Sequence, residues 1–548
     1  MQHSFFDFHN DDLISINEAA STSQVSSATI RNWVKVGHIN IEQKKYVSRS
    51  ELKKFISKRE GAGKLKSRAN KSKKDLHDHD KLSAEFKILI DSWKSDLDTL
   101  SDHYEAGLSE SFRNKEGIYY TPSKLVNEFF QLPNVNVKNL TFLDPCCGSG
   151  NFIIRALELG FKPSNIYGYD TDANAVHLTK RRIFEKTGFI SENIVNENFL
   201  NASINPGALK FDVIFTNPPW GKKIDKEEKI RYGELFNAGN SLDTCSLFMF
   251  ACFYRCVTSG YIGLLLPDSF FNIATFESAR IGALSLNIQK IIDHERPFKG
   301  LLSKAFSIVL KNEPKPTSNG DVICVTSGSV YNRALASFAR NPKSIFNFKT
   351  TGSDAKLIEH VFSVPHISLT NKARWGLGVV TGDNKKFIRQ NAILGYMPVH
   401  KGSDITREGL AKATSYIPRD LTLYQQVAPT EIYEAPIKLI YKFISSDLCF
   451  FCDTEQRYVL NSINMLIPAP SFPITPFQLC SLLNSDLMNW LFKNIFVTHK
   501  VLRADIESLP IHVDFFKKHS VFDEKRYLDF LFLERDNSGT FRIKSRDY

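Results

Sequence analysis

The order of apolar and polar positions changes character several times along the chain. From Thr141 to about Leu310, apolar runs of strand length alternate with glycine turns and amphipathic helices, the pattern of a doubly wound parallel α/β sheet. Residues 81–113 repeat their apolar positions at helical spacing. Beyond about Phe346, irregular strands and prolines precede a helix predicted over 476–496. We therefore expect a central α/β domain followed by a second large domain of α+β type.

The N-terminal segment has the signals of two short helices separated by a turn. Ser15 or Asn17 is suited to cap a first helix, and Ser27 begins a second helix that Gly37 ends. This pattern resembles the winged helix-turn-helix of the MerR and excisionase type, in which Arg31 would lie near DNA. A helical module for protein interaction is the alternative.

Length and composition indicate a globular protein with several domains. A chain of 548 residues with 42% hydrophobic content is expected to form two to four domains. The longest apolar stretches, such as 262–271, are interrupted and too short to span a bilayer, and the N-terminus has acids where a signal peptide is basic. We expect a cytoplasmic protein without a membrane partner.

The nine cysteines lack regular spacing, and CFFC at 449–452 has no second pair, so neither a disulfide framework nor a metal site is predicted.

Positive charge is concentrated in one part of the chain. The net charge is +11, and ten Lys or Arg residues stand against one Glu between Lys53 and Lys74. A polyanionic partner such as nucleic acid fits this excess, although such a run is more often a solvated linker. Residues 61–80 lack apolar periodicity and are interpreted as a basic flexible linker.

The sequence LTFLDPCCGSGNFIIRALELG (140–160) is the strongest sign of a ligand site. An apolar strand ends at Asp144, Gly148 and Gly150 let the backbone approach a ligand, and the helix beginning near Phe152 presents free amides. Dinucleotide-binding folds share such turns, but here the spacing is G-S-G-N-F rather than G-x-G-x-x-G. The preceding carboxylate repels pyrophosphate and suits a cationic amine or sulfonium.

The following strand ends at Asp170, about twenty residues beyond the glycines, where a carboxylate can accept both hydroxyls of a ribose. Asp172 is the alternative acceptor, or a cap of the next helix.

Residues 211–220, FDVIFTNPPW, join a strand to an unusual turn. Phe211–Thr216 has the pattern of a strand buried on both faces, and the two prolines cannot continue it because each lacks a backbone donor. A stiff turn at the carboxyl end of a strand lies where open α/β sheets bind ligands. A purely structural turn with a packing Trp is the alternative, and the distance from the glycine loop disfavours it. The turn consists of Asn217, Pro218, Pro219 and Trp220.

Four segments occur in one order: GIYYTPSKLVNEFF (117–130), DPCCGSGNF, YD at 169–170, and NPPW. This order resembles the amino-methylating DNA methyltransferases, specifically the adenine-N6 enzymes of gamma arrangement found in Type II restriction–modification systems. The resemblance covers roughly residues 115–312 well and the later half loosely. It implies a class I S-adenosylmethionine-dependent methyltransferase fold with a Rossmann-like sheet, S-adenosylmethionine as cofactor, and double-stranded DNA as partner. No nuclease cluster is evident in the sequence, so a cognate restriction endonuclease would be a separate chain.

The resemblance also implies roles for individual residues. Asn198 stands where relatives commonly have an acid, so its contact with the cofactor adenine would be an amide hydrogen bond. Either Phe298 or Phe306 would sandwich the flipped base together with Trp220, and either is equally suited to a core. The predicted catalytic residues are Asn217, Pro218, Pro219 and Trp220; the predicted cofactor-binding residues are Tyr120, Thr121, Pro122, Asp144, Pro145, Gly148, Gly150, Phe152, Asp170, Asn198 and Phe199.

The chemistry of amino methylation explains the residue types. The exocyclic nitrogen of adenine is a poor nucleophile because its lone pair is delocalised, and the Asn217 side-chain oxygen and the Pro218 carbonyl can each accept one of its N–H groups. The base must leave the duplex to reach them, and Trp220 would stack on it. Cytosine C5 chemistry needs a thiolate directly after this strand, and Trp220 rather than a cysteine follows Pro219. Cytosine N4, RNA, a protein glutamine, or a regulator with an inactive methyltransferase core are the alternatives.

The C-terminal half has two segments, 374–387 and 482–511, that resemble target-recognition domains of the same enzymes. Exposed lysines and arginines there would meet phosphates or merely solvent, and the candidates are Lys385, Lys386, Lys500 and Arg503. The predicted organisation is a helix-turn-helix module (1–60), a linker (61–80), a helical lead-in (81–115), a catalytic domain (116–312), a connector (313–345) and a target-recognition domain (346–548).

Overall fold

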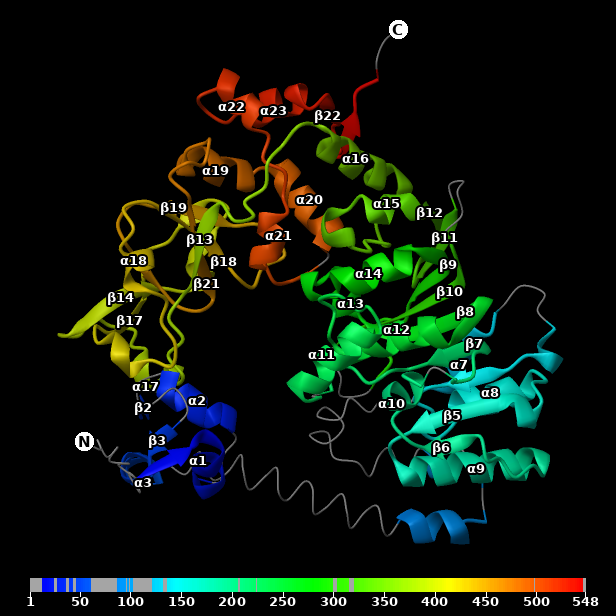
Figure 1. Ribbon diagram of the computed structural model, residues 1–548. Coiled ribbons are helices and arrows are strands. Elements are labelled where there is room, and N and C mark those ends of the chain that lie inside the picture. The colour runs from blue at the N-terminus through cyan, green and yellow to red at the C-terminus, as the bar shows by residue number, and fades with distance from the viewer. Residues whose placement is uncertain are drawn as a thin grey trace, which may run out of the picture. The chain divides into compact units, whose positions relative to one another are not determined.

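The computed structural model describes residues 12–23, 27–35, 39–42, 46–60, 86–94, 96–97, 99–101, 121–131, 136–205, 207–222, 224–298, 303–314, 320–496 and 498–545. The chain divides into two compact units, Met1–Glu85 and Phe86–Tyr548 (Figure 1). Within the described residues, no helix combines the length and the apolar character that crossing a membrane requires.

The first unit packs three helices against a small antiparallel sheet. Its core includes Ile30 and Trp33, and the Trp33 ring meets Phe55 edge-on with centroids 5.0 Å apart. The Ser15 hydroxyl accepts the Glu18 N–H at 3.2 Å, which makes it the first-helix cap. Gly37, the predicted end of the second helix, lies outside the described residues. The elements are β1 Leu13–Ser15, α1 Ile16–Ser23, α2 Ser27–Lys35, β2 Ile41–Glu42, β3 Tyr46–Ser48 and α3 Arg49–Glu60.

Among the described residues of the second unit, nine strands form one sheet in the order β12-β11-β9-β10-β8-β7-β4-β5-β6. Strands β6, β5, β4, β7 and β8 run parallel, as predicted, whereas β10 is antiparallel to both β8 and β9, so the sheet is mixed. The strands are β4 Phe142–Asp144, β5 Ile166–Asp170, β6 Ile194–Asn196, β7 Phe211–Thr216, β8 Cys256–Pro267, β9 Leu286–Asp293, β10 Ala305–Pro314, β11 Asp321–Thr326 and β12 Ser329–Ala334.

Helices cover both faces of this sheet. In β7, Val213 and Phe215 pack with helices α7, α8 and α9, whereas Ile214 packs on the opposite face with α10, α12 and α14. Burial on both faces explains why these strands are almost continuously apolar. The helices are α7 Ser123–Phe129, α8 Asn151–Glu158, α9 Ala173–Thr187, α10 Phe199–Ser203, α11 Lys226–Leu235, α12 Thr244–Arg255, α13 Asp268–Asn272, α14 Glu277–Leu284 and α15 Leu335–Ala339.

The segment expected to be a connector, 313–345, extends the sheet instead. Its hairpin β11–β12 joins through parallel pairing of β11 with β9, in which Cys324 lies opposite Ile291. The sheet therefore continues past the boundary expected at residue 312.

The described part of the C-terminal region contains a four-stranded sheet, a three-stranded sheet and two two-stranded sheets, β15–β16 and β22–β23, together with helices. Among its described strands, one sheet has the order β13-β21-β18-β19 and another the order β17-β14-β20. The elements are α16 Gly352–Ser363, β13 Ala373–Leu377, α17 Asn384–Phe387, β14 Tyr396–His400, β15 Ile405–Thr406, β16 Gly409–Leu410, β17 Ser415–Pro418, α18 Thr430–Tyr433, β18 Lys438–Lys442, β19 Phe450–Asp453, β20 Tyr458–Val459, β21 Ile463–Pro468, α19 Pro476–Leu483, α20 Asp486–Phe496, α21 Arg503–Glu507, α22 Val513–Lys518, α23 Glu524–Phe530, β22 Leu533–Arg535 and β23 Phe541–Ile543.

The single helix predicted over 476–496 is in fact two helices, α19 and α20. The Ser485 hydroxyl accepts the Met488 N–H at 3.2 Å, which caps the start of α20. The Asn484 side chain bonds outward to the Phe450 backbone, accepting its N–H at 2.9 Å and donating to its carbonyl at 2.8 Å. Asn and Ser compete for backbone hydrogen bonds in this way, which favours a break over a continuous helix.

Candidate active site

The glycine loop after β4 takes the tight course that the sequence predicts. Gly148 and Gly150 have positive φ angles of 47° and 90°, and α8 begins at the next residue, Asn151. A Cβ atom on Gly150 would lie 2.8 Å from the Thr179 hydroxyl oxygen, so a side chain is excluded by contact as well as by conformation.

Residues distant in the sequence hold this loop in place. The Cys147 N–H donates to the Tyr169 carbonyl at 2.9 Å, and the Thr179 hydroxyl donates to the Gly148 carbonyl at 2.9 Å. Buried Arg182 donates to the Ser149 carbonyl and, at 3.0 Å, to the Asn151 side-chain oxygen. The sequence analysis did not identify Thr179 or Arg182. The only indication of their role is that they are polar residues at buried positions of α9, most of which carry apolar side chains.

Two carboxyl groups lie at the carboxyl ends of adjacent strands. Asp144 ends β4 and is 1% exposed, and burial raises the pKa of its carboxyl to about 7 against the opposing hydrogen bond from the Cys146 N–H at 3.1 Å. Asp170 ends the neighbouring strand β5, and burial raises its pKa to about 6. Both groups are therefore acceptors in a poorly hydrated place, where a cationic ligand would favour their charged forms.

Asp170 already accepts two backbone hydrogen bonds, from Gly148 N–H at 2.8 Å and from Asp172 N–H at 2.9 Å. Each carboxylate oxygen can accept more than one bond, so acceptor capacity remains. Asp172, the alternative acceptor, caps α9 through bonds from the Asn174 and Ala175 N–H groups at 2.9 and 3.4 Å.

The NPPW turn follows β7, which pairs directly with β4, so it lies at the same edge of the sheet as the two carboxyls. Pro218 is buried, and Asn217 is partly exposed. The Trp220 indole donates to the Leu265 carbonyl at 3.1 Å, and its ring meets Phe298 edge-on with centroids 5.6 Å apart. The indole is thus fixed in one orientation beside the turn.

The candidate aromatic residues differ in their surroundings. Among ring contacts of the described residues, Trp220 meets Phe298 but not Phe306, which packs against Phe271 and Phe348. Phe199 is 1% exposed and lies between Tyr169 and Phe248.

The remaining predicted cofactor-binding residues differ in their contacts and burial. Buried Thr121 accepts the Asn151 side-chain N–H on its carbonyl at 2.9 Å, which joins the Thr-Pro segment to the start of α8. Phe152 packs edge-on against Phe129, in the core. Asn198 caps α10 by accepting the Leu200 N–H at 3.1 Å. Pro145 is buried and Pro122 exposed, and Tyr120 lies outside the described residues.

Asp268, at the start of α13 directly after β8, lies at the same edge and was missed by sequence reasoning. Burial raises the pKa of its carboxyl, with Lys304 and Arg296 opposing. An acid after an apolar strand was the available signal.

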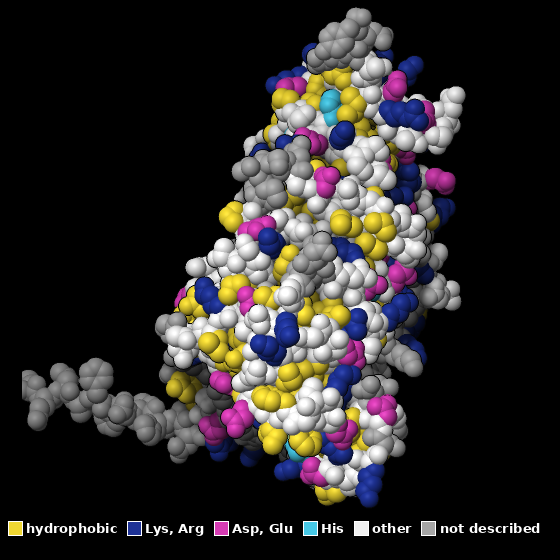
Figure 2. Space-filling model, turned by 90° about the vertical axis from the view of Figure 1, so that its right-hand side faces the viewer, with side chains coloured by type: hydrophobic (Ala, Val, Ile, Leu, Met, Phe, Trp, Pro, Cys, Tyr) yellow, Lys and Arg dark blue, Asp and Glu magenta, His cyan; other side chains and the backbone are white. Residues whose placement is uncertain are grey.

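The predicted DNA-contacting residues differ in their partners. Arg31, Lys385, Lys386 and Lys500 are exposed. The Arg503 guanidinium instead pairs with Glu507 at 2.9 Å and lies over the Trp375 ring at 5.5 Å. On the face that Figure 2 shows, cationic and acidic side chains are interspersed.

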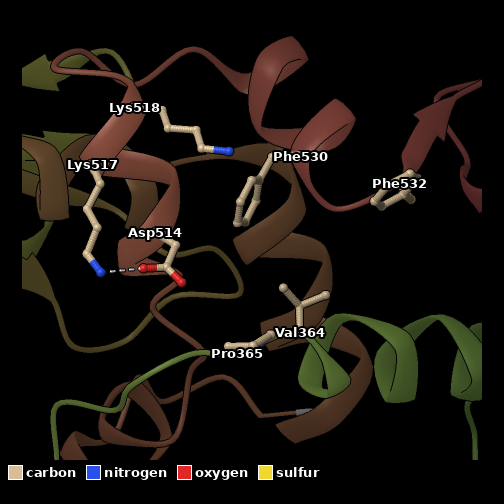
Figure 3. Close-up of a pocket in the computed structure, with 7 residues that line it drawn as sticks. All are labelled: Val364, Pro365, Asp514, Lys517, Lys518, Phe530 and Phe532. Atoms are coloured by element: carbon tan, nitrogen blue, oxygen red, sulfur yellow. Dashed lines mark ion pairs between the residues drawn. The ribbon is translucent and has the colours of Figure 1, made fainter.

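A hollow of about 430 Å³ lies in the C-terminal region, between the end of α16, α22 and residues 530–532 (Figure 3). Its lining is mostly apolar, with Lys518 and the Asp514–Lys517 ion pair at 2.7 Å. None of the predicted site residues lines it.

All nine cysteines are free. Within the described part of the chain, no group of three or more His, Cys, Asp or Glu side chains is arranged to hold a metal ion.

Comparisons with known proteins agree with this geometry. The N-6 DNA Methylase family matches residues 95–281, and the TaqI-like C-terminal specificity domain matches residues 397–511. The Type II methyltransferase M.VspI of Vibrio sp. (strain 343) is 45% identical over 408 residues, which are 74% of this chain and 100% of the relative. M.BanIII of Aneurinibacillus aneurinilyticus is 25% identical over 196 residues, 31% of this chain and 33% of the relative.

Solved structures of restriction–modification enzymes are also similar. The Type IIL enzyme MmeI in complex with DNA shares 12% identity with a TM-score of 0.49, covering 75% of this chain and 70% of that one. A modification subunit of a putative type I enzyme from Vibrio vulnificus YJ016 shares 20% identity with a TM-score of 0.35, covering 43% of this chain and 53% of that one.

The fold and the strand-edge site define an α/β methyltransferase with a C-terminal specificity domain. The chain belongs to the Type II DNA methyltransferases of restriction–modification systems. Enzymes of this family use S-adenosylmethionine as methyl donor and DNA as substrate.

The residues present fit this cofactor. Gly150 lets the loop turn tightly against Thr179, where a Cβ would not fit, and the carboxyls of Asp144 and Asp170 would be acceptors for a cation and for ribose hydroxyls. The free amides at the start of α8 lie in the same loop.

Proposed function

We propose that this enzyme methylates the N6 nitrogen of adenine at a specific sequence in double-stranded DNA, after the base has left the helix. The observation that supports this best is the position of NPPW: it follows β7, directly beside β4 and its glycine loop. A rigid amide and prolyl carbonyl at that point suit an exocyclic amino group next to a methyl donor. S-adenosylmethionine supplies a methyl group on a sulfonium when bound.

The residues of the turn have distinct roles in this proposal. The Asn217 side-chain oxygen and the Pro218 carbonyl each accept one N–H of the amino group, which directs the nitrogen lone pair away from the ring. Positioning and electrostatics are the main contributions, and no strong base is needed because the proton can leave after transfer. Pro219 keeps the turn stiff.

Trp220 and Phe298 are proposed to hold the flipped base. The Trp220 indole is fixed by its bond to Leu265, and Phe298 meets it edge-on. The edge-on contact leaves no space for a base between the two rings, so Phe298, which is buried, is proposed to hold the indole on which the base stacks, a contact that Phe306 does not make. A base inside the duplex is out of reach of such a site, so flipping is required.

Around the glycine loop, Asp144, Pro145, Gly148, Gly150, Asp170 and the Thr121–Pro122 segment are proposed to hold the cofactor. Asn198 and Phe199 are proposed at its adenine, although both are engaged in the fold, as a helix cap and in the core. Thr179 and Arg182 are added here as residues that fix the loop.

Cytosine N4 is the second candidate because it has the same amino geometry, and Asn before the prolines favours adenine. The specificity domain favours DNA over RNA or a protein glutamine. The first unit, with Arg31 exposed on α2, is proposed to be a winged helix-turn-helix that serves as an accessory DNA-binding module. A cognate restriction endonuclease would be a separate chain.

The test is to sequence DNA from cells that express the protein, with detection of modified bases. We expect N6-methyladenine at one sequence motif and none in a matched culture that expresses Asn217→Ala. Modification confined to cytosine would overturn the proposal.

A further inference from the structure

A short loop of the specificity half, residues 390–395, presents aliphatic side chains to solvent. Leu394 is 100% exposed, and its neighbour Ile393 is 47% exposed. Single exposed aliphatic residues are common, but complete exposure of a leucine beside a second aliphatic side chain leaves all of its apolar surface in water. Contact with an apolar partner would bury this surface and would therefore be favourable.

The backbone at both ends of this loop is fixed. Arg389 and Tyr416 exchange two backbone hydrogen bonds of 2.9 and 2.8 Å, and the Arg419 N–H donates to the Gly395 carbonyl at 3.1 Å. Gly395 closes the turn with a φ of +83°, and the Tyr396 N–H returns to the Ile393 carbonyl at 3.0 Å. The loop is therefore a defined projection at the start of β14.

Cations outnumber acids in the segments that form and flank the projection, where the neighbouring acids are Asp383 and Asp420. The segment 385–396 contains three Lys or Arg residues and no acid. Lys385, Lys386 and Arg419 are exposed, and among the described residues no ion pair joins them to a carboxylate; the Lys386 ammonium lies over the Phe387 ring at 4.9 Å. Arg389 is not counted with them because its guanidinium donates to the carbonyls of Lys385 and Ile388.

An apolar side chain flanked by cations that lack carboxylate partners is complementary to a DNA duplex, whose apolar stacked bases lie between two anionic phosphate backbones. Apolar side chains can enter between base steps, and the bend that results brings more protein surface into contact with DNA. Cations on each side would meet the flanking phosphates.

We propose that Leu394 is an apolar wedge that enters the DNA duplex and unstacks one base step, while Lys385, Lys386 and Arg419 bind the flanking phosphates. This inference rests on the proposed function for its double-stranded substrate. It adds a DNA-deforming element in the specificity half that is separate from the residues holding the target base.

The experiment uses the full-length protein and a duplex that contains its mapped methylation site. The fluorescent base 2-aminopurine, which brightens on unstacking, is placed in turn at positions across and beside the site. With the wild type we expect a bright position other than the target base, and with Leu394→Ala that position becomes dark. The dissociation constant should rise roughly tenfold to a hundredfold, as expected for losing the burial of a leucine.

Two variants serve as controls. Leu394→Met keeps an apolar side chain of similar size and should retain both signals. Ile190→Ala removes a 77% exposed isoleucine from the loop before β6 and should change neither. Leu394 makes no packing contact that its replacement could remove, so we expect the melting temperature of Leu394→Ala to equal that of the wild type.

Unchanged affinity and an unchanged fluorescence profile for Leu394→Ala would overturn the wedge. So would a change in self-association, measured by sedimentation, without a change in DNA binding, because the tip would then contact a second copy. Both outcomes leave adenine methylation intact. Conversely, a duplex methylated only at cytosine N4 would overturn the proposed function while the wedge remained testable on the same DNA.

Discussion

The Phe298 ring meets the Trp220 indole edge-on, with centroids 5.6 Å apart and an interplanar angle of 79°. The indole is also fixed by its hydrogen bond to the Leu265 carbonyl. These two aromatic residues come from segments almost eighty positions apart, and their contact places Phe298, rather than Phe306, beside the indole on which the flipped base is proposed to stack.

Replacing Phe298 by Ala should lower kcat/KM for DNA methylation by roughly tenfold to a hundredfold, because the indole would lose the contact that holds it for base stacking, which contributes about 1–3 kcal/mol. Phe306→Ala is the matched control. That ring packs against Phe271 and Phe348, so its loss should reduce thermal stability and leave the kcat/KM of the folded fraction nearly unchanged. Equal losses of kcat/KM in the two variants would speak against the assignment.

Gly150→Ala should weaken S-adenosylmethionine binding measured by calorimetry, since the new Cβ would lie 2.8 Å from the Thr179 hydroxyl oxygen. The positive φ of 90° adds about 1–3 kcal/mol of strain for a residue with a side chain. Gly160→Ala provides the control: its φ is +95°, but nothing lies within 4 Å of its added Cβ. We expect that variant to bind the cofactor as the wild type does, and a comparable loss of affinity would refute the steric argument.

Asp144→Asn should change the pH dependence of stability. Burial raises the pKa of the folded carboxyl to about 7, whereas in the unfolded chain it is about 3.9. The folded wild type therefore holds a proton that the unfolded chain loses, and its stability falls as the pH rises from about 4 to about 7. Without cofactor, the variant should melt above the wild type at pH 8 and nearly equal it at pH 4. A constant difference across this range would contradict the raised pKa.

Deleting residues 1–60 should leave the methylated motif unchanged. These residues belong to a compact unit separate from the one that contains the sheet and the specificity domain. The comparison is made by sequencing modified bases from cells that express the full-length or the truncated chain. Loss of methylation at the motif would assign sequence recognition to the first unit and favour a regulator-like role.

Strand ends were the most predictable part of the site. Asp144, Asp170 and Asn217 each follow a short apolar run that glycine, proline or a polar residue interrupts, so local sequence places them at one edge of a parallel sheet. The residues that fix the loop could not be found in this way. Thr179 and Arg182 are about thirty positions from the carbonyls that they bind, and nothing local indicates that partnership.

Non-local pairing also explains the differences in the fold. The hairpin β11–β12 joins the sheet because β11 pairs with β9, about thirty positions earlier in the chain. Local sequence does not reveal this pairing, so residues 313–345 were expected to be only a connector. The break between α19 and α20 depends on bonds from Asn484 to Phe450, which apolar periodicity does not reveal.

The central claim is that the amino nitrogen of an adenine is the methyl acceptor. The most direct measurement incubates purified protein with S-adenosylmethionine labelled in its methyl group and duplexes of varied sequence, then digests the DNA to nucleosides and separates them. We predict that the label is recovered as N6-methyl-2′-deoxyadenosine from duplexes with one motif and is absent with Asn217→Ala. Label recovered as N4-methyl-2′-deoxycytidine, or in RNA or protein instead of DNA, would contradict the account.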